Sequence, residues 1–209
     1  MSYLTTRADV DPERIGVLGI CGSGGYVPYA AQTDHRMKAV ATVSAADLAR
    51  FWKKADPEGF QQMVKQSGQW RSDEAVAGYA GAHQINALPD TVDDSTPRLI
   101  REFVDYYRTP RGHHPRATNR WVARSADQFD QFDAFAGAAK IAPRPLLMIA
   151  GTEAETLPHS QDAVASAGVT AELFTINGAT HVDLYDKDEY VTQAAAKLTG
   201  FFRQHLTKA

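Results

Sequence analysis

The single cysteine of the chain lies on a glycine-rich turn that follows an apolar segment. The segment Ile15–Ile20 predicts a buried strand, and residues 26–33 read as a helix. The pattern Gly-x-Cys-x-Ser-Gly therefore places the thiol of Cys21 on a sharp strand-to-helix turn, which is the geometry of a nucleophile elbow. Because the positive end of a helix stabilises an anion, we expect a lowered thiol pKa and a thiolate available for attack on a carbonyl carbon.

A thiol nucleophile needs a base that takes its proton and a third group that orients the base. His181 is the best candidate for the base, because it lies in a loop after a predicted strand, where side chains reach the carboxyl end of a sheet. The loop after the preceding strand, residues 151–156, should supply the orienting acid. This loop contains Glu153 and Glu155, and Asp162 lies on the helix predicted after it.

The elements that must position these residues belong to an α/β fold. Four apolar segments predict parallel strands that are covered on both faces, at residues 15–20, 38–44, 145–150 and 171–176. A last helix is predicted over residues 188–205. Residues 47–139 read as helical and carry no strand signal. We therefore expect a mostly parallel sheet built from residues 1–46 and 140–209, with a helical cap insertion at 47–139.

Composition narrows the classes of function. The 209 residues include 44% hydrophobic and 22% charged residues and carry a net charge of -3, so no basic field points to nucleic acid. One cysteine excludes an internal disulfide and fits a reducing compartment. No apolar run approaches the ~20 residues needed to cross a bilayer. We expect a cytoplasmic protein with a small-molecule acyl substrate, and with no membrane partner, cofactor or metal.

Several segments together resemble a known family. They are Arg14-Ile15-Gly16-Val17-Leu18-Gly19-Ile20-Cys21, Tyr106-Tyr107-Arg108-Thr109-Pro110-Arg111-Gly112, Pro143-Arg144-Pro145-Leu146-Leu147 and Gly178-Ala179-Thr180-His181-Val182-Asp183-Leu184-Tyr185-Asp186. The chain resembles the α/β-hydrolase superfamily near its dienelactone-hydrolase-like branch, and more closely a group that includes polyketide transferases of fungal biosynthesis. The resemblance implies Cys21 as nucleophile, Glu155 as acid and His181 as base. It also implies a hydrolase of ester, lactone or thioester bonds, or an acyltransferase with an alcohol acceptor.

The chain departs from this superfamily at its N-terminal side. Members carry several strands before the elbow strand, whereas only Met1–Glu13 precede Arg14 here. The backbone amide of Gly22 remains as one oxyanion donor, but the loop expected to provide the second donor is missing. Half a sheet also leaves an open edge. We therefore expect either a fragment of a longer protein or another chain, such as a second copy, over that edge. A truncated, non-catalytic interaction or dimerisation module is the alternative function.

Other interpretations compete at single positions. Ser23 is an alternative nucleophile, although the apolar run ends at Ile20 and favours an elbow at the next residue. The glycines could form a dinucleotide loop with Asp47 as the ribose ligand, but their spacing is not Gly-x-Gly-x-x-Gly. His113 and His114 have no carboxylate at metal-ligand spacing.

Substrate contacts are expected from the end of the insertion. The candidates are Tyr106, Tyr107, Arg108 and Arg111. Core packing for Tyr107, which shares a helical stripe with Phe103, and ordinary surface positions for the arginines are the alternatives.

Overall fold

The computed structural model describes residues 1–78 and 81–207, and the chain divides into two compact units. The first, which we call the sheet unit, comprises Met1–Asp47 and Asp133–Ala209. The second, the helical unit, comprises Leu48–Phe132. The predicted insertion covers residues 47–139, and this second unit covers Leu48–Phe132.

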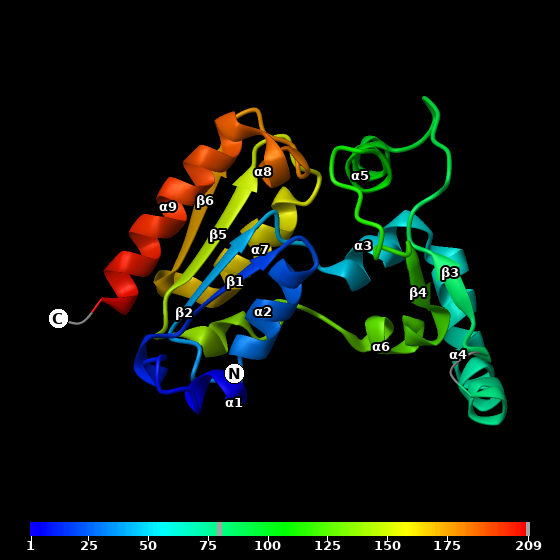
Figure 1. The fold of residues 1–209 in the computed structure, drawn as a ribbon, viewed down its shortest axis with the longest axis horizontal. Helices are drawn as coiled ribbons and strands as arrows, with labels where there is room; N and C mark the ends of the chain where they lie inside the picture. Colours follow the sequence, from blue (N-terminus) through cyan, green and yellow to red (C-terminus); the bar gives the residue numbers. More distant parts are fainter. Residues whose placement is uncertain (79–80, 208–209) are drawn as a thin grey trace. The chain divides into compact units, whose positions relative to one another are not determined.

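The sheet unit alternates strands and helices along the chain (Figure 1). Its elements are α1 (Ser2–Thr5), η1 (Pro12–Arg14), β1 (Gly16–Ile20), α2 (Ser23–Ala31), β2 (Ala39–Val43), η4 (Ala138–Ile141), β5 (Leu146–Gly151), α7 (Leu157–Ala167), η5 (Gly168–Thr170), β6 (Ala171–Ile176), α8 (Asp183–Asp186) and α9 (Asp188–Leu206). The four predicted strands are all present, each within one or two residues of its expected ends.

These four strands form one parallel sheet in the order β1-β2-β5-β6. The register pairs Ile20 with Val43, Val43 with Ile149, and Gly151 with Ile176. All strands therefore end at the same edge of the sheet, and the loops that follow them meet there. This is the edge where ligands bind in open α/β sheets.

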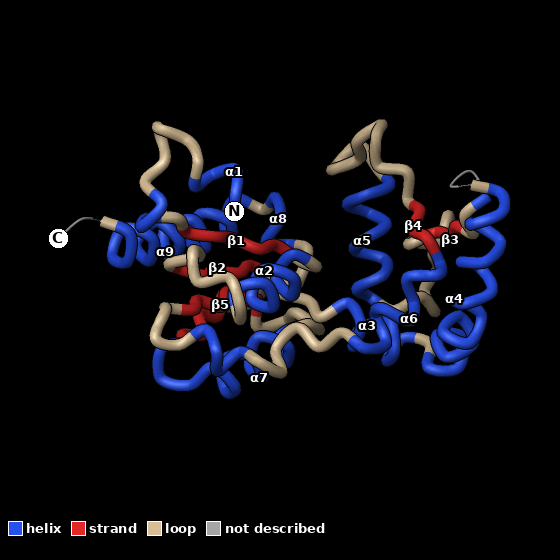
Figure 2. Tube along the Cα trace, turned by 90° about the horizontal axis from the view of Figure 1, so that it is seen from below, coloured by secondary structure: helices blue, strands red, loops and turns tan. Residues whose placement is uncertain are grey.

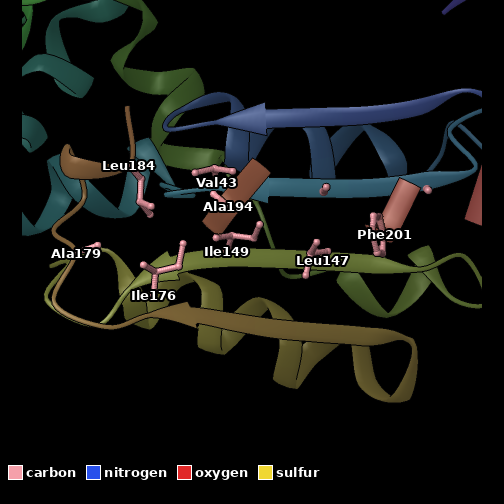
Figure 3. Packing of buried hydrophobic residues seen from close by; sticks show 10 residues of the cluster. Val43, Leu147, Ile149, Ile176, Ala179, Leu184, Ala194 and Phe201 are labelled. Carbon is pink, nitrogen blue, oxygen red and sulfur yellow. The ribbon is translucent and has the colours of Figure 1, made fainter. Parts of the chain in front are cut away.

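The main apolar core lies between the sheet and α9 (Figure 3). Alternate residues of β2 and β5, among them Val43, Leu147 and Ile149, face the helix residues Ala194 and Phe201. The remaining residues of these two strands are buried as well, because α2 and α7 cover the other face (Figure 1). Burial on both faces explains why these strands are apolar throughout.

Strand β1 differs from β2 and β5, because it stands at one edge of the described sheet. Its residues Leu18 and Ile20 are 42% and 48% exposed. A groove of about 630 Å³ beside it is lined by Leu18 together with Leu198, Phe202 and Leu206 of α9, among others. The sheet unit thus presents an apolar surface at this edge.

The helical unit contains a small sheet that the sequence pattern did not predict (Figure 2). Its elements are α3 (Leu48–Ala55), α4 (Pro57–Ala77), β3 (Gln84–Asn86), α5 (Arg98–Arg108), β4 (Arg120–Val122), η3 (Ala123–Ser125) and α6 (Ala126–Gln131). Strands β3 and β4 pair antiparallel, so the prediction that this region lacks strands was wrong. Each strand has only three residues, which is too short for an alternating pattern to be visible.

Among the described residues, the structure contains no helix with the length and apolar character needed to cross a membrane.

The loops after β5 and β6 approach each other closely at the carboxyl edge of the sheet, and this approach requires glycine at position 151. A Cβ there would lie 2.0 Å from the carbonyl oxygen of Ala179. We expect Gly151→Ala to lower the free energy of unfolding by about 1–3 kcal/mol, the usual cost of overpacking. Gly200→Ala in α9 is the matched control, since its Cβ would meet nothing within 4 Å and alanine favours a helix. Urea denaturation of both variants checks this; an equal stability change would contradict the required close approach.

Candidate active site

Cys21 occupies the turn between β1 and α2 with a backbone φ of 56°. Its amide donates to the carbonyl of Val43 at 3.1 Å, and its own carbonyl accepts from Ala46 at 3.0 Å. Both bonds tie the turn to the end of β2. The left-handed conformation falls at Cys21 and not at Ser23, which is the first residue of α2. Backbone strain of this kind is concentrated at functional sites.

Small residues around Cys21 make the turn sterically feasible. A Cβ at Gly19 would lie 2.2 Å from the carbonyl oxygen of Ser23. A Cβ at Gly24 would lie 2.5 Å from Cα of Ala45. Gly19 is therefore needed where β1 approaches the start of α2, and Gly24 is needed where α2 packs against the chain that follows β2.

The sulfur of Cys21 is half-buried and has two hydrogen-bonding partners, the Tyr185 hydroxyl and the backbone amide of Gly22. Burial raises the pKa of the thiol, and these two hydrogen bonds offset the rise only in part. The expectation of a lowered pKa was therefore wrong. The helix start does contribute through Gly22, but desolvation of the thiolate is the larger effect.

His181 is completely buried at the same edge of the sheet. It lies in the loop between β6 and α8, as the sequence predicted. Its backbone carbonyl accepts a hydrogen bond from the Ser44 hydroxyl at 2.8 Å, and Ser44 has a positive φ of 48° directly after β2. Ser44 thus fastens the histidine loop to the centre of the sheet. Sequence reasoning missed this residue, because a serine at the end of an apolar strand is a weak signal.

Both ring nitrogens of His181 are hydrogen-bonded. Nδ1 lies 2.6 Å from Oγ1 of Thr156, and Nε2 lies 2.8 Å from the hydroxyl of Tyr185. Thr156 is itself buried, whereas Glu153 and Glu155 are exposed. The structure thus brings a hydroxyl, one residue beyond Glu155, to the nitrogen where we expected a carboxylate. The role of Glu155 stays a prediction.

The loop that carries Thr156 is fixed against the histidine loop by backbone contacts. The amide of Glu153 donates to the carbonyl of Ala179 at 3.0 Å, and Thr152 donates to Ile176 at 3.0 Å. The Thr152 hydroxyl accepts from Gly178 at 2.9 Å. The position of Thr156 relative to the imidazole therefore follows from main-chain geometry.

The imidazole of His181 is strongly biased towards its neutral form. Burial, and secondarily the nearby His159, lower its pKa from 6.5 to about 3. The cysteine and the histidine are therefore both uncharged at neutral pH, and a resting thiolate–imidazolium pair is not formed.

Asp47, the residue considered as a ribose ligand, has a structural role within the sheet unit. Its carboxylate accepts from the amide of Ala134 at 2.9 Å, and its amide donates to Nδ1 of His159 at 3.0 Å. It is buried and links the two segments at which the chain leaves and re-enters this unit.

The residues proposed to bind substrate lie at the end of α5 and just beyond it, within the helical unit. Tyr106 contacts the ring of Tyr107, with centroids 4.9 Å apart, and Arg111 lies over Tyr106 at 5.4 Å. Arg111 also pairs with Asp105 at 2.7 Å, and Arg108 is exposed. These contacts explain the local packing, and substrate binding by all four residues stays a prediction.

Within the part of the chain that the structure describes, no group of three or more His, Cys, Asp or Glu side chains could hold a metal ion. Nδ1 of His114 accepts a hydrogen bond from the amide of Arg116 at 3.2 Å.

Comparisons with known proteins were made on the whole chain. No family model matches it. It is 33% identical to the uncharacterized protein YcjY of Escherichia coli over 214 residues, which cover 99% of this chain and 69% of YcjY. The chain belongs to the same family as YcjY. It is also 35% identical to the uncharacterized protein PA2218 of Pseudomonas aeruginosa, over 99% of this chain and 56% of PA2218.

Solved structures show the fold of this chain. The crystal structure of PA2218 matches with a TM-score of 0.85 and 33% identity, covering 98% of this chain and 65% of that one. The α/β hydrolase GrgF from Penicillium sp. sh18 matches with a TM-score of 0.74 and 17% identity, covering 98% of this chain and 68% of GrgF. The fold is therefore that of the α/β-hydrolases, as predicted. The chain spans only a little over half the length of PA2218.

The buried neutral histidine predicts a loss of stability in acid. The unfolded state binds a proton near pH 6.5, whereas the folded state does so only near pH 3, so stability is full above pH 6.5 and falls as the pH drops towards 3. At about 1.36 kcal/mol per pKa unit, His181 should cost about 2 kcal/mol between pH 7 and pH 5. Urea denaturation at both pH values should show this loss in wild type and in His113→Gln, and not in His181→Gln. An undiminished loss in His181→Gln would disprove the assignment.

Proposed function

We propose that the chain is a hydrolase of ester, lactone or thioester bonds that works through a covalent acyl intermediate on Cys21. The sulfur attacks the carbonyl carbon, and its proton passes to His181. The imidazolium then returns a proton to the leaving group as the carbonyl–leaving-group bond breaks. Water attacks the resulting thioester with His181 again as base, which releases the acid and restores the thiol.

The observation that supports this proposal most directly is the position of Cys21. A left-handed φ of 56° projects its side chain at the carboxyl edge of the sheet, and the Gly22 amide is directed at the sulfur. An amide in that position can donate to the oxyanion that forms on the attacked carbonyl. His181 lies in a loop at the same edge, and the whole arrangement belongs to the sheet unit.

The protonation states narrow the substrate class. Neutral thiol and neutral imidazole must exchange a proton during attack, and an imidazole with a pKa of about 3 is a weak base. Efficient turnover then depends on a leaving group that departs easily. Activated esters, lactones and thioesters meet this condition, and amides do not.

The acyl acceptor distinguishes two versions of the reaction. With water as acceptor the chain is a hydrolase. With an alcohol as acceptor it is an acyltransferase, as its resemblance to the dienelactone-hydrolase-like and polyketide-transferase-like branch would suggest. Burial of the imidazole favours neither acceptor by itself, and product analysis in the presence of added alcohols distinguishes them.

An interaction module is the second candidate function, favoured by the exposed edge of β1. Leu18 and Ile20 are 42% and 48% exposed there, and such an edge can pair with a further strand. A second copy of the chain is the partner that we propose for this edge.

Substitution of the nucleophile tests the enzymatic proposal. Wild type should release nitrophenol from short p-nitrophenyl esters, and Cys21→Ala should reduce this release to the background rate. Ser23→Ala is the matched control, because Ser23 lies in the same turn but begins α2; it should retain activity. Equal rates in wild type and Cys21→Ala would refute the proposal, and a stable oligomer in that case would favour the interaction module.

A pair of substitutions tests which residue orients the imidazole. Thr156→Val removes the hydroxyl 2.6 Å from Nδ1 at nearly constant volume. We expect kcat/KM to fall about tenfold, the equivalent of one hydrogen bond of about 1.4 kcal/mol. Glu155→Gln removes the charge of the adjacent exposed residue and should have a smaller effect. If Glu155→Gln is the more damaging change, the carboxylate and not the hydroxyl orients the base.

A further inference from the structure

We propose that the hydroxyl of Tyr185 relays the proton between Cys21 and His181. This inference deepens the proposed function and rests on it. The observation behind it is that Tyr185 contacts both groups: its oxygen lies 2.8 Å from Nε2 of His181, and it also hydrogen-bonds the sulfur of Cys21.

The four groups form a continuous chain of donors and acceptors. With the proton of the imidazole on Nδ1, the Cys21 thiol donates to the Tyr185 oxygen and the Tyr185 hydroxyl donates to Nε2. Nδ1 then donates to Oγ1 of Thr156, 2.6 Å away. Every acceptor in this chain has one donor, so the sequence of bonds is complete without a charged group.

Tyr185 is held in this position by its own short helix. The preceding residue, Leu184, is buried in the core beside Ile176 and Ala179 (Figure 3). At the start of α8, the amide of Thr180 donates to the Asp183 carboxylate at 3.1 Å. The backbone amide of Asp183 in turn donates to the Thr180 hydroxyl at 3.3 Å. The Tyr185 ring meets the imidazole edge-on, with centroids 5.6 Å apart.

The negative charge of Asp183 is maintained by its partners. Burial alone would raise its pKa, but the hydrogen bond from Lys187 and that from the Thr180 amide lower it overall. Lys187 pairs with this carboxylate at 2.7 Å. The turn that carries Tyr185 is therefore anchored on both sides.

The proton balance of the relay is simple. As sulfur attacks the carbonyl carbon, the S–H proton moves to the Tyr185 oxygen while the Tyr185 proton moves to Nε2, which leaves a neutral tyrosine and an imidazolium. When the leaving group departs, the two transfers run in reverse, and the Tyr185 hydroxyl delivers the proton. Tyr185 is unchanged after each step, and no co-reactant is required.

Other titratable groups face the hydrogen-bonded row of Cys21, Tyr185, His181 and Thr156 from neighbouring elements. His159 of α7 lowers the pKa of His181. Tyr26 of α2 faces the cysteine side, and burial, followed by the charges of Cys21 and Asp47, raises its pKa. A pH profile of the relay must be compared with variants at these positions.

Removal of one hydroxyl tests the relay. Tyr185→Phe should lower kcat for p-nitrophenyl esters by about 10²-fold, the lower range for loss of a general acid–base pathway, with little change in KM. Tyr190→Phe in α9 is the control for loss of a tyrosine hydroxyl elsewhere in the sheet unit. Unchanged or increased turnover in Tyr185→Phe would overturn the proposal.

A second variant separates a relay from a structural role. Replacement of Tyr185 by 3,5-difluorotyrosine keeps a hydroxyl on the same ring but makes it more acidic. The relay predicts recovery of turnover relative to Tyr185→Phe and a shift of the alkaline limb of the kcat profile to lower pH. The same replacement at Tyr190 in α9 should leave that limb in place. A Tyr185 profile identical to that of wild type would contradict a relay.

Alkylation of Cys21 by iodoacetamide distinguishes failure of the relay from failure of the proposed function, since it requires no turnover. At pH 7, Tyr185→Phe and His181→Gln should each slow alkylation, and the double variant should be no slower than the slower single variant, because both act on one transfer. Multiplicative effects, or no effect of Tyr185→Phe, would overturn the relay. Slowed alkylation without ester hydrolysis would retain the relay and refute the hydrolase.

Discussion

The complete burial of the His181 imidazole is the constraint on which the rest of the site depends. A buried ring with two polar nitrogens is stable only if both are hydrogen-bonded, and here the partners are the hydroxyls of Thr156 and Tyr185. Thr156 comes from the loop after β5, and Tyr185 comes from the short helix α8. Ser44 adds a third attachment, through the His181 carbonyl. The arrangement of three loops is thus determined by the need to satisfy one side chain.

A second constraint acts on the backbone around Cys21. The positive φ of this residue is strained for any side chain other than glycine, and the surrounding packing compensates for the cost. Gly19 and Gly24 allow separations that a Cβ would forbid, and the carbonyl of Cys21 accepts a hydrogen bond from Ala46. The elbow and the buried histidine are linked through β2, since its last residue accepts from Cys21 and the next one, Ser44, holds the histidine loop.

Sequence patterns were sufficient for the sheet and for two of the site residues. Apolar runs located all four parallel strands, and glycine spacing and strand-end position located Cys21 and His181. Three features were missed for physical reasons. The strands β3 and β4 are too short for a period to appear. Thr156 and Tyr185 are common residue types whose importance arises only from three-dimensional contact with His181. The start of a helix lowers the pKa of the thiol and burial raises it, and only the structure shows that burial has the larger effect.

For the proposed relay, the uncharged resting state has a mechanistic consequence. The hydrogen bonds that link Cys21, Tyr185, His181 and Thr156 can all run in either direction. The tautomer of His181 decides which group of each pair is the donor. With the proton on Nδ1, the sulfur is a donor and is ready to lose its proton towards the ring. With the proton on Nε2, Tyr185 donates towards the sulfur and the thiol cannot use the imidazole as a base. Thr156, as the partner of Nδ1, therefore influences the reactivity of a sulfur that it does not touch, because the productive tautomer requires that the threonine hydroxyl accept from Nδ1. A hydroxyl can accept or donate, whereas a carboxylate can only accept, so a threonine at this position leaves both tautomers accessible.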